Sequence, residues 1–106
     1  MKTIDIGHEN LSVDIALSVL ESEVSNAMFH DEIRSIKIVH GHGSGILRSA
    51  VRQWCNKQSG RFREVIPGEK YDLFHQKSIE MRQDCGFPKD RDFGRKNRAV
   101  TYIWLL

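Results

Sequence analysis

The chain has 106 residues, 40% of them hydrophobic, which suits one compact domain of ordinary globular composition. No apolar run approaches the roughly 20 residues of a membrane span, and the start MKTIDIGHEN is too polar for a secretory signal, so we expect a soluble cytoplasmic protein with no membrane partner. The formal net charge is +2, but residues 1–33 contain one basic and seven acidic side chains, whereas residues 34–106 contain fifteen basic and seven acidic. A basic region favours a polyanionic partner if its side chains gather on one face.

The first half of the chain predicts two strands that alternate with two helices. Thr3–Ile6 is a short β-branched run with Asp5 near its carboxyl end, which indicates a strand. Ser12 is placed to cap a helix whose apolar residues recur at three- and four-residue spacing: Val13, Ala16, Leu17, Leu20, Val24, Ala27 and Met28. Ser35–Val39 is typical of a buried strand, and helical spacing returns from about Gly45.

The second half predicts two more strands and a long connection between them. Phe62–Ile66 ends at a Pro-Gly turn signal, and Ala99–Leu105 is an apolar and aromatic run. Within the connection, Tyr71–Asp84 fits a helix loosely, and the following KDRDFGRKNR has five basic and two acidic residues around Phe93. This last stretch is either a mobile arm that contacts phosphates and stacks a base on Phe93, or a solvated loop whose Phe93 packs against the sheet.

The stretch HGHGSGILR, residues 40–48, lies between a predicted strand and a predicted helix. The unpaired N–H groups of the first helical turn would point into this loop, and its glycines would let a ligand approach the backbone, an arrangement that binds anions. No Walker Gly-Lys-Ser/Thr follows, and the glycines are too closely spaced for the dinucleotide fingerprint. His40, His42 and Arg48 would add hydrogen-bond donors and a proton carrier beside a bound phosphate.

These nine residues match the HGxGxGxLR signature at every fixed position, and the chain thereby resembles the Smr (small MutS-related) domain family. Ile4-Asp5-Ile6 is similar to the start of the family's Leu-Asp-Leu-His-Gly strand motif, and residues 11–17 to the helix opening that follows it. The resemblance implies an α/β (α+β) fold, a two-layer β-α-β-α-β-β sandwich with a four-stranded mixed sheet, two helices on one face and the last strand antiparallel. Residues 1–106 would form one Smr-like domain with an insertion at about 68–98.

The resemblance also implies binding of DNA or RNA and, in several members, endonuclease activity that nicks the strand. Carried over to this chain, the catalytic candidates are Asp5 and His40, together with His8, because Gly7 stands where the family has its motif histidine. The candidates for nucleic-acid contact are Gly41, His42, Gly43, Ser44, Gly45, Arg48, Arg52, Arg95 and Lys96.

For cleavage of RNA, a histidine would deprotonate the 2′-hydroxyl or a water while Arg48 and the loop N–H groups stabilise the developing charge, with no cofactor required. For DNA, Asp5 and a histidine could hold a divalent metal. Residue-level alternatives stay open: Asp5 could cap the neighbouring turn, and the His40 ring could be hydrogen-bonded beneath the loop. The alternative function is a binding module that does not cut, whose partner is nucleic acid or a protein docked on the acidic first helix. In either case we expect a monomer.

Overall fold

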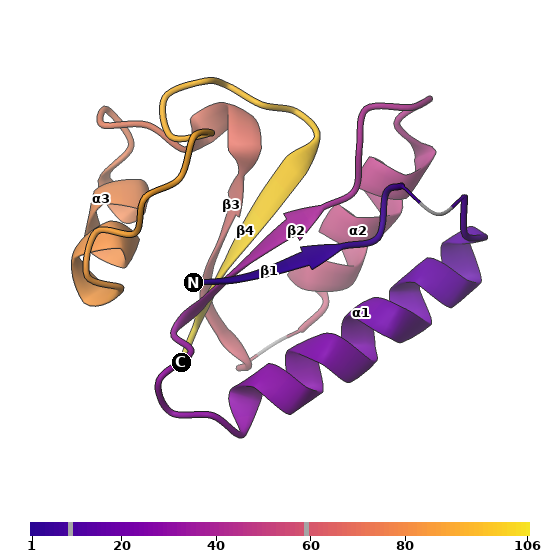
Figure 1. The fold of residues 1–106 in the computed structure, drawn as a ribbon, viewed down its shortest axis with the longest axis horizontal. Coiled ribbons are helices and arrows are strands. Elements are labelled where there is room, and N and C mark those ends of the chain that lie inside the picture. Colours follow the sequence, from indigo (N-terminus) through magenta and orange to yellow (C-terminus); the bar gives the residue numbers. More distant parts are fainter. Residues whose placement is uncertain (9, 59) are drawn as a thin grey trace.

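The computed structural model describes residues 1–8, 10–58 and 60–106. A four-stranded sheet lies at the centre, with helices α1 and α2 on one side and α3 on the other (Figure 1). The elements follow in this order: β1 (Lys2–Asp5), α1 (Val13–Met28), β2 (Ser35–Val39), α2 (Ile46–Asn56), β3 (Phe62–Pro67), a short 3-10 turn (Gly68–Lys70), α3 (Gln76–Asp84) and β4 (Val100–Leu105). Within the described residues, no helix combines the length and apolarity needed to cross a membrane.

The sheet has the strand order β1-β2-β4-β3. β1 and β2 are parallel, and β4 is antiparallel to both of its neighbours, β2 and β3. This mixed sheet confirms the predicted α+β class and the antiparallel last strand. Because β1 and β2 are parallel, with Asp5 opposite Val39, the residues that follow both strands emerge at the same edge of the sheet.

One face of the sheet is covered by α1 and α2, as the sequence predicts. α1 starts after Ser12, whose Oγ accepts a hydrogen bond from the Ile15 N–H at 3.3 Å, so the predicted N-cap forms. The buried residues of this core are Ala16, Leu20, Val24 and Ala27 of α1, Val51 and Cys55 of α2, and Ile4, Ile6, Ile36, Ile38, Ile103 and Leu105 at the sheet. Their burial fixes the two helices against β1 and β2, and thereby fixes the loop between β2 and α2.

The opposite face is covered by the β3–β4 connection, residues 68–99. Alternate residues of β4 point to this face and form a second core with the connection, comprising Ile66, Tyr71, Met81, Val100, Tyr102 and Trp104. The predicted helix over Tyr71–Asp84 begins only at Gln76, because Asp72 accepts from the Phe74 N–H in a turn and the His75 side chain caps α3 by accepting from the Ser78 N–H. Both faces of β4 are therefore buried.

The basic stretch KDRDFGRKNR is held to this second face by polar contacts and by Phe93. Lys37 Nζ on β2 lies 2.7 Å from Asp90 Oδ1 and also contacts Asp92 Oδ2, while the Tyr102 hydroxyl donates to Asp90 Oδ2 at 2.6 Å. The Phe93 ring packs edge-on against Tyr71, with 5.1 Å between ring centroids. Of the two interpretations of this stretch, the structure shows the one in which Phe93 packs inward, so its ring is not presented for stacking on a base.

Candidate functional site

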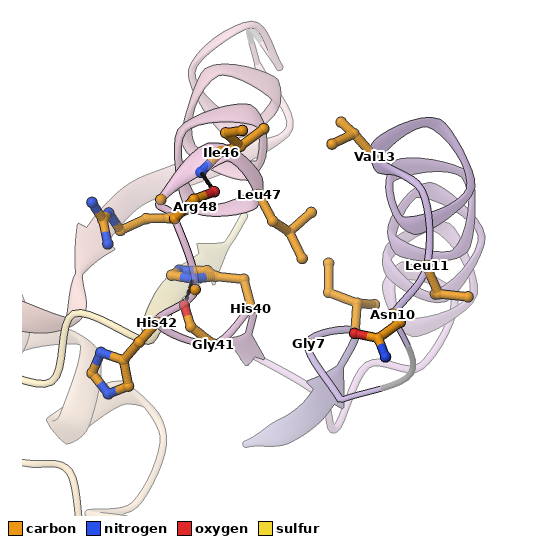
Figure 2. A pocket seen from close by; sticks show the side chains of 14 residues that line it. Gly7, Asn10, Leu11, Val13, His40, Gly41, His42, Ile46, Leu47 and Arg48 are labelled. Carbon is orange, nitrogen blue, oxygen red and sulfur yellow. Dashed lines mark hydrogen bonds between the residues drawn. The ribbon is translucent and has the colours of Figure 1, made fainter.

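A cavity of about 270 Å³ lies beyond the carboxyl ends of β1 and β2, between the first turns of α1 and α2 (Figure 2). Its lining comes from the residues that follow β1 (Ile6, Gly7), from the residues that lead into α1 and its first residue (Asn10, Leu11, Val13) and from residues 40–48. The glycine stretch singled out in the sequence therefore forms most of this cavity. Among the residues that the structure describes, no acidic side chain lines it.

The glycine loop, residues 40–45, depends on backbone conformations that favour glycine. Gly41, Gly43 and Gly45 have φ values of 81°, 42° and 88°, in the left-handed region where a side chain is strained. Gly45 is the N-cap of α2 and has no side chain to accept from the helix N–H groups, and Ser44 Oγ accepts only weakly from the Ile46 N–H, at 3.4 Å. The first turn of α2, which contains no acidic residue, is therefore a favourable place for an anion.

His40 forms the floor of the cavity and is only 4% exposed. Its Nδ1 lies 3.2 Å from the Gly41 carbonyl oxygen, which can only accept, so Nδ1 carries the proton and Nε2 accepts from the Thr101 hydroxyl at 2.9 Å. The pKa of His40 is lowered to about 4, chiefly by burial and in part by the nearby cations of Arg52 and Arg48, against the opposing hydrogen bond to Gly41. The ring is therefore neutral at pH 7 and has both nitrogens engaged within the protein, as in the hydrogen-bonded alternative stated above.

Arg52 lies behind His40 and does not line the cavity. Its guanidinium forms a two-pronged ion pair with Glu69, with N–O distances of 2.6 and 3.0 Å, and its Nε donates to Thr101 Oγ1 at 3.0 Å. The same hydroxyl is the partner of His40, so Arg52, Thr101 and His40 form one hydrogen-bonded chain under the loop. The Arg52 guanidinium is thus engaged with Glu69 and Thr101 within the protein, and the phosphate contact that the sequence predicts for it stays a prediction.

Asp5, the last residue of β1, and His8 form an exposed pair. Asp5 Oδ1 is 3.0 Å from His8 Nδ1, and it also accepts from the Gly7 N–H at 3.0 Å. Partial burial raises the pKa of Asp5, but the hydrogen bonds from His8 and Gly7 outweigh it and hold the pKa below its usual range. Among the described residues, no hydrogen bond joins Asp5 to His40, whose ring partners are Gly41 and Thr101. The structure thus unites Asp5 with His8.

The backbone packs so closely around Gly7 that a histidine side chain has no room at this position. A Cβ atom at residue 7 would lie 2.7 Å from the His40 carbonyl carbon and 2.8 Å from its oxygen. Because these are backbone atoms of the glycine loop, a side chain here would push β1 and the loop apart. The histidine displaced by one position, His8, instead reaches the Asp5 carboxylate from the turn.

The Smr domain model matches residues 9–77 of the chain. The chain belongs to the Smr domain family. This confirms the family predicted from the HGxGxGxLR signature. Among solved structures, the Smr domain of Thermus thermophilus MutS2 is similar in fold, with a TM-score of 0.66 and 19% sequence identity over 100% of this chain and 99% of that chain. No curated protein matches the sequence significantly.

Arg48 of this Smr domain lines the cavity from the first turn of α2. A Cβ at Gly45 would lie 2.8 Å from Arg48 Nη2, so the absence of a side chain at Gly45 lets the guanidinium fold back over the loop. Figure 2 shows His42, Arg48 and Ile46 on the side of the glycine loop and α2, and Leu11 and Val13 on the side of α1. The lining residues thus include the cationic Arg48 together with the aliphatic Leu11, Val13, Ile46 and Leu47. The cavity therefore has a polar and an apolar part.

Arg95 and Lys96 lie outside the cavity, on the β3–β4 connection, and both are exposed. Ala99, at the end of this connection, accepts hydrogen bonds from the N–H groups of His40 and Gly41, at 2.9 and 3.0 Å. The connection is thereby joined directly to the glycine loop.

The part of the chain that the structure describes contains no preformed set of metal ligands. No group of three or more His, Cys, Asp or Glu side chains converges there. Asp5 and His8 form only a pair.

Proposed function

We propose that this Smr domain binds the phosphodiester backbone of DNA or RNA at the glycine loop. The observation that carries the proposal is the open cavity in which the first turn of α2 and the Arg48 guanidinium adjoin glycines in left-handed conformations, with no acidic lining side chain among the described residues. N–H groups at a helix start and an arginine are the usual ligands of a phosphate. His42 and Ser44, both exposed on the loop, would add hydrogen bonds.

The β3–β4 connection would extend this contact. Of the seven charged residues in KDRDFGRKNR, the two acidic ones, Asp90 and Asp92, turn inward to Lys37, which leaves the basic side chains exposed. Arg95 and Lys96 are among them. Because the connection ends at the glycine loop, a strand bound at the loop could continue along these cations.

Salt-dependent binding of a fluorescent oligonucleotide tests the proposal. Replacing Arg48 with Gln should weaken binding and reduce the slope of log K against log salt by about one, since one phosphate contact is lost. Lys57→Gln is the matched control, because Lys57 is an exposed cation at the other end of the same helix and should leave binding unchanged. If both variants bind like the wild type, the glycine loop is not the binding surface.

A second candidate function, strand cleavage, is favoured by the Asp5–His8 pair. An aspartate that orients an imidazole and stabilises its protonated form is a common device for general-base catalysis. Here His8 would deprotonate a ribose 2′-hydroxyl or a water, and Asp5 would support it, while the loop stabilises the negative charge on the phosphate. His40, neutral and engaged on both nitrogens, would position the loop.

Nicking assays on matched RNA and DNA strands, with and without a chelator, test this second function. Asp5→Asn and His8→Gln should each abolish cleavage but leave binding largely intact. His30→Gln is the control, because His30 also lies beside an exposed carboxylate elsewhere on the surface, with 3.8 Å between its Nδ1 and Glu32 Oε1. Intact strands under all conditions would leave the domain as a binding module.

A further inference from the structure

The apolar part of the cavity is formed by aliphatic side chains from its two sides. Leu11 precedes α1 and Val13 begins it, and Ile46 and Leu47 come from the first turn of α2. Ile46 is 65% exposed although it is a large aliphatic residue. Figure 2 shows Ile46 and Val13 on opposite sides of the opening. A solvent-filled gap between aliphatic walls is unfavourable, and its filling by an apolar group would be favourable.

The phosphate-binding elements border the same gap. Leu47 and Arg48 are adjacent in the chain and both line the cavity, as does the whole glycine loop. Asn10, held with a φ of 51°, adds a side-chain amide that offers both a donor and an acceptor at the α1 side. An occupant that satisfies all of these groups combines an anion, a flat apolar body and polar edges.

A nucleotide has this combination, and we propose that the gap between Val13 and Ile46 receives one unpaired base of the strand whose phosphate lies on the glycine loop. This inference rests on the proposed function and gives it a substrate class, namely single-stranded or locally unpaired nucleic acid. The two faces of the base contact the aliphatic side chains, and its edge reaches the Asn10 amide.

An intact duplex does not offer such a base. Its bases are stacked and paired inside the backbone, so one nucleotide has to be unstacked and turned out before it can enter a pocket. A single strand, a loop or a bulge presents unstacked bases without that cost. The geometry therefore predicts a preference for single strands that comes from base contacts and not from charge.

Fluorescence anisotropy with three labelled ligands of equal length tests the inference: a short single strand, its duplex, and an abasic strand that keeps the sugar-phosphate chain but has no bases. We expect the single strand to bind about tenfold more tightly than either the duplex or the abasic strand. Ile46→Ala should remove most of this difference without changing the affinity for the abasic strand. Leu106→Ala is the matched control, because Leu106 is 66% exposed at the opposite end of β4.

The outcomes separate this inference from the proposed function. If all three ligands bind with equal affinity and Arg48→Gln lowers the affinity for each of them, the loop binds phosphate but the gap holds no base. In that case only the inference is overturned. If Ile46→Ala weakens binding of the abasic strand as much as binding of the single strand, the Ile46 side chain contacts the sugar-phosphate chain and not a base. The inference is then also overturned. If no ligand binds, the proposed function fails and the inference fails with it.

Discussion

Acidification from pH 7 to pH 5 should destabilise this Smr domain through His40. The ordinary pKa of histidine is 6.5, and burial lowers the pKa of His40 to about 4 in the folded domain. The unfolded chain therefore takes up a proton in a pH range where the folded domain does not, so stability falls as the pH drops through that interval. With these two pKa values, the loss between pH 7 and pH 5 is about 2 kcal/mol, reaching about 3 kcal/mol below pH 4.

Urea unfolding of the wild type and of His40→Gln at both pH values measures this loss. Glutamine retains a donor and an acceptor for Gly41 and Thr101 but does not titrate, so the variant should lose about 2 kcal/mol less than the wild type between pH 7 and pH 5. His42→Gln, on the exposed loop, is the control and should follow the wild type. Equal losses in the wild type and His40→Gln would refute the assignment, as would an NMR titration of the His40 ring with a midpoint near its ordinary value.

Two further substitutions test contacts that position the site. Lys37→Met leaves the Asp90 and Asp92 carboxylates buried without their cation and should lower the free energy of unfolding by about 3–5 kcal/mol; urea unfolding with an unchanged midpoint would contradict the buried network. Gly7→Ala places a Cβ against the backbone of His40 and should cost about 1–3 kcal/mol; a thermal midpoint equal to that of the wild type would show that β1 and the loop separate freely.

The sequence predicts the parts of this domain that depend on local pattern. The apolar stripe of α1 and its Ser12 cap have helical spacing, and the glycines of residues 40–45 lie where a buried strand gives way to a helix. These patterns involve residues within one or two helical turns of each other, so the sequence predicts the corresponding elements without knowledge of the tertiary structure.

The polar contacts under the site could not be predicted in this way. Arg52 meets Glu69 and Thr101, which follow it by 17 and 49 residues, and Lys37 meets Asp90 53 residues later. In the sequence an arginine inside a basic helix looks like a surface cation, and only the packing of β4 beside β2 turns Thr101 toward it. The same holds for Phe93, whose inward position depends on Tyr71 and Tyr102.

The most direct test of the phosphate-binding loop is a titration of the isotope-labelled domain with a short single strand, followed by the backbone amide signals. The account predicts that the amides of residues 42–48 shift most and saturate together, because this segment adjoins the bound phosphate, and that the amides around Arg95 and Lys96 shift as well. Shifts confined to the distant end of α1 around Met28, with the amides of residues 42–48 unmoved, would contradict it.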